Sequence, residues 1–123
     1  GKNMSDFDIN NIKNIVLESL DNLKTQEIVA IDVSKRSNFT DILMIGTGTS
    51  STHIKAISNE VTSNLKKNGY GDLIRGVESN SEWVLIDIFD IVVNLMLSET
   101  REFYSLEKLW SSDASYKSET TPV

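Results

Sequence analysis

The segment from Glu82 to Leu97 places the strongest constraint on how this chain can fold. In both halves of the segment, apolar residues recur at every second position. One side of the first half would carry Val84, Ile86 and Ile88, and the other Trp83, Leu85 and Asp87. The second half alternates in the same way, with Ile91, Val93, Leu95 and Leu97 on one side and Val92, Asn94 and Met96 on the other. Because side chains of a strand point alternately to two faces, each half is predicted to be a β-strand. Ile88 and Phe89, between Asp87 and Asp90, are predicted to form the hairpin turn.

The two faces of the first predicted strand differ in chemistry. One is entirely aliphatic and is expected to join the core. The other combines the indole of Trp83, an aliphatic side chain and the carboxylate of Asp87, which suits a surface that meets a partner. An ordinary central hairpin with Trp83 half-buried is the alternative interpretation of the same pattern.

Composition narrows the class of protein. The chain has 123 residues, of which 39% are hydrophobic and 24% charged, as expected for one globular domain. It has no apolar run near the ~20 residues that a membrane span needs, and no signal-peptide pattern. The absence of cysteine and the single histidine argue against a metal site, and no cofactor motif stands out. We therefore expect a cytoplasmic protein without metal or cofactor.

The formal net charge of −6 bears on the kind of partner. An acidic protein is repelled by phosphate backbones, so nucleic acid is not expected as the primary contact. A basic protein partner fits better, although negative charge can also serve solubility alone.

The predicted elements alternate between helices and strands. Residues 1–8 are expected to be a non-native leader, up to Asn3, and a flexible N-terminus, residues 9–110 the domain, and residues 111–123 a disordered tail. Asp8 is predicted to cap a first helix. Strands are predicted at 28–33, 42–45 and 73–75, and Glu78 is expected in a polar loop at 78–81. A short helical patch is predicted at 106–110. This order predicts an α+β fold, α/β-like, with a mixed sheet flanked by helices.

Gly46 to Ser51 forms a glycine-rich segment between a predicted strand and a predicted helix. Such a turn can cradle phosphate with its backbone amides, but this one lacks the lysine of a P-loop and the GxGxxG spacing. A plain turn, with Thr49 or Ser50 capping the helix and Gly69 ending it, is the simpler interpretation. His53 lies in the first helical turn, where we expect a hydrogen-bonded structural role.

Three segments together resemble the ribosomal silencing factors, the RsfS or Iojap family. They are Asp41 to Ile57, which contains the Ser-Ser-x-His signature at Ser50–His53, the hairpin from Glu82 to Met96, and Glu99 to Trp110. The resemblance implies a sheet of about five strands with helices, related to nucleotidyltransferases but without their catalytic motif, and no enzyme activity. It further implies binding to large-subunit ribosomal protein fourteen (uL14), which blocks subunit joining and lowers translation under nutrient limitation, and a homodimer when free. The competing hypothesis is a nucleotide-binding enzyme that uses Gly46–Ser51.

The resemblance and the residue pattern nominate five partner-binding residues. The hairpin and closing motifs assign partner contact to Trp83 and Tyr104. The residue pattern adds Asp87 on the same strand face, Met96 beside it if the hairpin register is simple, and Glu78 nearby. Alternative roles are a hydrogen bond at the hairpin end for Asp87 and core packing for Met96.

Three positions depart from the family pattern. Asn94 stands where His is common, and Ser79 and Phe89 stand where Gly is common. Asn94 keeps the ability to hydrogen-bond but does not titrate. Phe89 is expected either to adopt a strained positive φ or to require a different turn.

Overall fold

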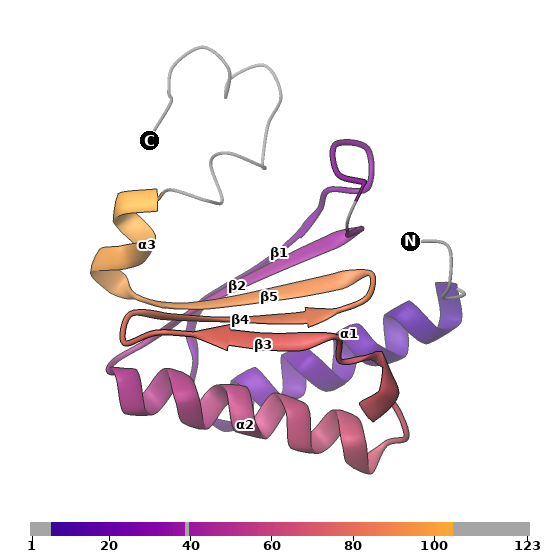
Figure 1. Ribbon diagram of the computed structural model, residues 1–123, viewed down its shortest axis with the longest axis horizontal. Helices are drawn as coiled ribbons and strands as arrows, with labels where there is room; N and C mark the ends of the chain where they lie inside the picture. Colours follow the sequence, from indigo (N-terminus) through magenta and orange to yellow (C-terminus); the bar gives the residue numbers. More distant parts are fainter. Residues whose placement is uncertain (1–5, 39, 105–123) are drawn as a thin grey trace.

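The computed structural model describes residues 6–38 and 40–104 (Figure 1). The elements follow the chain in this order: α1 (Asp6–Asn22), β1 (Gln26–Asp32), β2 (Ile42–Gly48), α2 (Ser51–Lys67), the 3₁₀ turn η1 (Gly71–Leu73), β3 (Gly76–Ser79), β4 (Trp83–Ile88), β5 (Ile91–Leu97) and α3 (Ser98–Tyr104). The predicted helical patch at 106–110 and the predicted tail lie outside the described residues. Within them, no helix is long and apolar enough to cross a membrane.

The five strands form one mixed sheet in the order β1-β2-β5-β4-β3. β2 and β5 pair in parallel at the centre, and the other neighbours pair antiparallel. The hairpin of β4 and β5 thus lies beside β2 in the sheet, although α2, η1 and β3 separate β2 from β4 in the sequence. The sheet and its three helices confirm the predicted α+β class.

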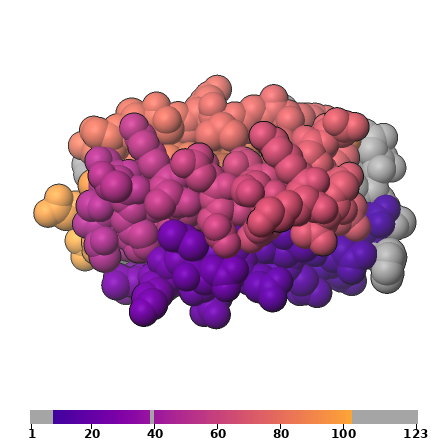
Figure 2. Space-filling model, turned by 90° about the horizontal axis from the view of Figure 1, so that it is seen from below, coloured from indigo at the N-terminus to yellow at the C-terminus, as the bar shows by residue number. Residues whose placement is uncertain are grey.

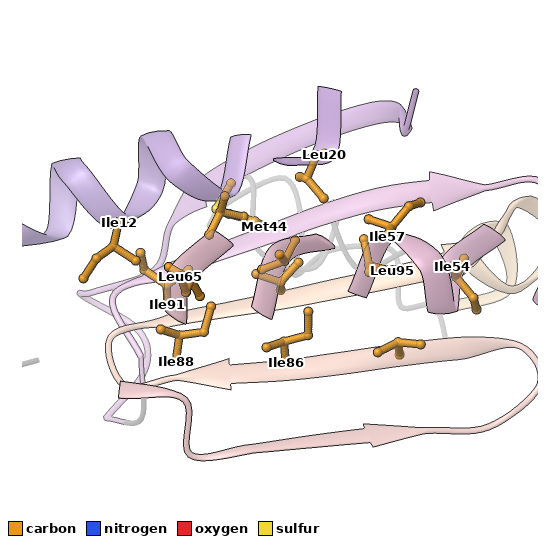
Figure 3. Close-up of a cluster of buried hydrophobic side chains, with 14 residues drawn as sticks. Ile12, Leu20, Met44, Ile54, Ile57, Leu65, Ile86, Ile88, Ile91 and Leu95 are labelled. Atoms are coloured by element: carbon orange, nitrogen blue, oxygen red, sulfur yellow. The ribbon is translucent and has the colours of Figure 1, made fainter. Parts of the chain in front are cut away.

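The two long helices cover one face of the sheet. Figure 1 shows α1 and α2 side by side beneath the strands, and Figure 2 shows their continuous outer surface. The core lies between these helices and the sheet (Figure 3). Its fully buried side chains include Ile12, Leu20, Met44, Ile54, Ile57, Leu65, Ile86, Ile88, Ile91 and Leu95. The predicted aliphatic faces of β4 and β5 both point into this core.

The capping residue of α2 agrees with the prediction, whereas the start of α1 does not. Asp8 was expected to cap α1, but the helix begins at Asp6, so Asp8 lies inside its first turn. Ser50 caps α2 as predicted, since its Oγ accepts a hydrogen bond from the His53 amide. α2 ends at Lys67, and Gly69 beyond it has φ 86°, a conformation that glycine adopts without a steric penalty.

The third strand lies later in the chain than predicted. Residues 71–73 form η1, and β3 runs from Gly76 to Ser79, so Glu78 is in a strand rather than a loop. All four residues of β3 are exposed. An edge strand this short, without a buried face, carries no alternating pattern from which its position could be predicted.

The turn between β4 and β5 is also shifted by one residue. Ile88 still pairs with Ile91, so the turn consists of Phe89 and Asp90 rather than Ile88 and Phe89. The expected positive φ of Phe89 is confirmed at 51°. The Arg75 guanidinium lies 4.2 Å from the centre of the Phe89 ring. This cation–π contact, typically ~0.5–1 kcal/mol at an exposed site, offsets part of the backbone strain.

Candidate functional site: the open face of the sheet

The face of the sheet opposite α1 and α2 is the candidate site, and we call it the open face. It carries the alternate residues of the strands, which the register arranges into three rows across the sheet. The first row contains Thr47, Met96 and Trp83. The middle row contains Ile45, Asn94, Leu85 and Glu78. The third row contains Leu43, Val92, Asp87 and Gly76. Directly paired residues of neighbouring strands lie close enough to present one continuous surface.

The open face changes in chemistry from one side to the other. On the β1 and β2 side, Val33, Leu43 and Ile45 form a second buried cluster, against which Ile31 and Val92 pack. On the β3 and β4 side the surface becomes acidic, with Glu78 exposed and Asp87 half-buried. The accessible part of the face therefore lies over β4, β3 and part of β5, where Trp83 and Leu85 are half-buried beside an acidic border that complements a basic protein surface.

The first row brings Trp83 and Met96 together. They are direct partners in the β4–β5 register, so the expected proximity of Met96 to Trp83 is confirmed although the turn is shifted by one residue. Trp83 is half-buried, whereas Met96 is only 3% exposed. Trp83 thus offers contact area to a partner, while Met96 lies behind the surface beside it, as the core-packing alternative anticipated.

Arg101 holds α3 at the end of the open face that carries this row. It is 5% exposed, and its guanidinium donates hydrogen bonds to Thr47 Oγ1 at 2.8 Å and to the Glu27 carbonyl at 2.5 Å. Glu27 has φ 49° and lies where the β1–β2 register shifts between Gln26 and Val29. The irregular backbone of β1 therefore presents a carbonyl to Arg101, and the two bonds join α3 to β1 and β2.

Only some of the predicted site residues lie next to one another in the structure. Trp83 and Met96 are neighbours, and Glu78 faces Leu85 in the middle row. Asp87 is four positions from Trp83 along β4, about 13 Å away at the usual rise of a strand. None of the hydrogen bonds described in residues 6–38 and 40–104 involves its carboxylate. Tyr104 is the last residue of α3, and its side chain lies outside what the structure describes.

Sequence reasoning did not nominate three residues that the structure places in or behind the site. Leu85 and Asn94 occupy the middle row, and Arg101 anchors α3. The alternation of β4 and β5 already contained the signal for the first two, because they share a face with Trp83 and Met96. Arg101 had no comparable signal, since its partners, Thr47 and the Glu27 carbonyl, lie far away in the sequence.

The glycine-rich segment does not form the turn on which the nucleotide hypothesis depended. Gly46, Thr47 and Gly48 belong to β2. A Cβ at Gly46 would approach the Thr25 Cγ2 to 2.6 Å, and one at Gly48 would approach the Ile54 Cγ2 to 2.5 Å. These glycines therefore allow the chain's own side chains to pack closely, and leave no space for a phosphate at either position.

The Thr49 and His53 amides at the start of α2 are engaged within the protein. Ser50 Oγ accepts from the His53 amide, and His53 Nδ1 accepts from the Thr49 amide at 2.9 Å. Because Nδ1 is an acceptor, Nε2 carries the proton and donates to the Leu23 carbonyl at 2.8 Å. His53 thus links the end of α1 to the start of α2, which confirms the structural role expected of it.

The described residues do not assemble a metal site. Among residues 6–38 and 40–104, no group of three or more His, Asp or Glu side chains converges as metal ligands do. The open face itself presents an indole, an amide and acidic groups, from Trp83, Asn94, Glu78 and Asp87, which suit recognition by contact.

Comparisons with known proteins agree on one family. A family model described as "Ribosomal silencing factor during starvation" matches residues 7–122. The ribosomal silencing factor RsfS of Haemophilus influenzae is 35% identical over 96 residues, which cover 78% of this chain and 94% of that protein. A crystal structure of a Chromobacterium violaceum protein is similar with a TM-score of 0.79 at 34% identity, covering 85% of this chain and 88% of that one.

An organellar protein also matches. The mouse protein named "Mitochondrial assembly of ribosomal large subunit protein 1" is 31% identical over 109 residues, which cover 85% of this chain and 46% of the mouse protein. With the family model and the bacterial relatives spanning most of the sequence, the chain belongs to the ribosomal silencing factor family, the RsfS or Iojap-related proteins, which regulate the ribosome without being enzymes.

Proposed function

We propose that this protein binds the large ribosomal subunit through uL14 and blocks joining of the small subunit, which represses translation when nutrients are limited. The observation that carries the proposal is membership of the family, whose description names ribosome silencing during starvation. The name of the mouse relative, which refers to the large ribosomal subunit, supports the choice of subunit. Such a protein works in the compartment that holds its ribosomes, which in a bacterium is the cytoplasm.

The open face is the docking surface in this proposal. Trp83 is half-buried in the free protein, so a partner can complete its burial, and aromatic residues of this kind supply much of the energy of protein interfaces. Glu78 and Asp87 border the same face and would attract a basic ribosomal protein during encounter. We include Tyr104 because α3 is anchored by Arg101 at the end of the face that carries Trp83.

The mechanism is steric exclusion. A rigid domain bound to uL14 occupies space that the small subunit needs. Repression therefore requires tight binding and a sufficiently large bound protein, but no covalent chemistry. The β4–β5 hairpin suits this role because its other face is packed into the core, which holds the contact residues in place before binding.

Co-sedimentation with separated ribosomal subunits tests the proposal. The protein is expected to travel with the large subunit, and titration with purified uL14 is expected to saturate. Asn59→Leu, on the exposed outer side of α2, serves as a control that adds apolar surface away from the open face. Migration with the small subunit alone, or with neither subunit, would overturn the proposal.

The same proposal includes a homodimer in the absence of ribosomes. Trp83 and Leu85 are half-buried on the open face, and a second copy can cover them. Light scattering at high protein concentration is expected to give twice the monomer mass, and Trp83→Ala is expected to lower it. A monomer mass for the unmodified protein at high concentration would exclude the dimer.

A further inference from the structure

The side-chain amide of Asn94 occupies the centre of the open face. In the register its partners are Ile45 on β2, which is fully buried, and Leu85 on β4, which is half-buried. Along β5 the residues before and after it on the same face are Val92 and Met96. A polar side chain is therefore surrounded on four sides by apolar residues, in a strand, where asparagine is disfavoured.

No hydrogen bond among the described residues explains why an asparagine stands at position 94. Other asparagines of the chain are engaged: Asn64 donates to Ser19 and Glu60, and Asn80 Oδ1 accepts from two backbone amides. None of the hydrogen bonds described in residues 6–38 and 40–104 involves the side chain of Asn94. Its amide is half-buried, and its polar atoms are not among the described buried atoms that lack a partner. The side chain of Asn94 is therefore partly exposed and makes no described hydrogen bond within residues 6–38 and 40–104.

A partner that covers the open face would bury this amide. Burying an amide without a new hydrogen bond is costly, whereas a matched hydrogen bond makes its burial acceptable. The asparagine amide offers two donors and one acceptor, which complement the N–H and C=O of a peptide group.

We propose that Asn94 is the specificity-determining residue of this surface and hydrogen-bonds a main-chain peptide group of the bound protein at the centre of the interface. The inference rests on the proposed function, because it assigns a role within that docking surface. It differs from the anchor role of Trp83: the indole supplies contact area, whereas Asn94 discriminates between partners with and without a correctly placed polar group.

A matched pair of substitutions tests this role. Asn94→Val and Asn94→Thr have nearly the same shape and both suit a strand, but threonine keeps a hydroxyl that can donate and accept. Both variants are expected to melt at or above the temperature of the unmodified protein, because the replaced amide makes no described internal hydrogen bond. Binding to purified uL14 is expected to weaken roughly five- to hundredfold for Asn94→Val, and clearly less for Asn94→Thr.

The outcomes separate this inference from the proposed function. If the unmodified protein binds uL14 and Trp83→Ala weakens binding, but Asn94→Val binds as tightly as Asn94→Thr, only the role of Asn94 is overturned. If Asn94→Val lowers the melting temperature strongly, the amide is structural and the inference is equally overturned. If the unmodified protein itself does not bind uL14 or the large subunit, the proposed function fails together with the inference.

Discussion

The two faces of β4 carry different chemistry although their residues alternate one by one. Val84, Ile86 and Ile88 are at most 1% exposed and belong to one aliphatic core with α1 and α2. Trp83, Leu85 and Asp87 are half-buried and chemically mixed. Along β4, residues that stabilise the core therefore alternate one by one with residues that can contact a partner. Substitutions at adjacent residues should therefore affect different measurements.

The largest expected effect is on the core side. Ile86→Ala removes a fully buried side chain that lies between the sheet and the helices. It should lower the free energy of unfolding by ~2–5 kcal/mol, measured by chemical denaturation, whereas Ile86→Val should cost ~0.5–1.5 kcal/mol. Affinity for uL14, corrected for the folded fraction, should stay unchanged. A specific loss of affinity in Ile86→Val would break the separation of the two faces.

Trp83→Ala examines the other side of the same strand. Because Trp83 is half-buried on the open face, its truncation should cost less folding stability than the ~3–5 kcal/mol that is typical of a fully buried aromatic residue. It should cost at least ~2 kcal/mol of binding, so roughly thirtyfold weaker association. A chemical melt and a uL14 titration on one preparation measure both quantities. Collapse of stability with normal binding by the folded fraction would place Trp83 with the core.

Asp87→Lys tests whether the acidic border of the open face steers the partner. Reversing this charge should slow association several-fold with little effect on dissociation, and the effect should shrink as salt rises. Lysine can extend its charged end into solvent, so folding stability should change by no more than about 0.5 kcal/mol. Stopped-flow binding at two salt concentrations measures the rates. An association rate that is reduced by the same factor at both salt concentrations would indicate a direct contact of Asp87 instead of electrostatic steering.

The smallest effect is expected at Asp32, which belongs to neither the core nor the three rows. The Ser34 hydroxyl, at 2.7 Å, and the Ser34 amide, at 2.9 Å, donate to its carboxylate and lower the pKa of Asp32. A lowered folded-state pKa gives stability that is present above the unfolded value near 3.8 and is lost as pH falls through the folded value.

Asp32→Asn removes this contribution. The variant should therefore be slightly less stable than the unmodified protein at neutral pH, and the difference should disappear in acid. Thermal melts from pH 7 to pH 2 measure it, with uL14 binding at neutral pH as the control that should not change. A stability difference that grows on acidification would contradict the assigned cause.

Much of the fold could be predicted from periodic segments, because burial imposes the period. The alternation from Trp83 to Leu97 correctly assigned the aliphatic face of β4 to the core and predicted both strands of the hairpin. Predictions were wrong where no such pattern exists. β3 is an exposed edge strand, and Gly46 to Gly48 extend β2 because their missing side chains make room for Thr25 and Ile54.

The candidate site was less accessible to sequence reasoning, because its rows join strands that are distant in the chain. The direct pairing of Trp83 with Met96 depends on the turn at Phe89 and Asp90, one residue later than the predicted turn. The pairing of Asn94 with Ile45 depends on the β2–β5 contact, which no local signal indicates. The same holds for Arg101, whose bond to the Glu27 carbonyl depends on an irregular β1.

The parallel pairing of β2 with β5 also determines when the surface first exists. Gly48 pairs with Leu97, so the sheet closes only after a long intervening chain has been made and folded. Contacts between such distant residues form late, because closing a long loop costs entropy before any contact compensates for it. A growing polypeptide lacks a complete open face until β5 and α3 have left the exit tunnel. Under the proposed function, the ribosome that synthesises this repressor can finish most of the chain before the product is able to dock on any ribosome.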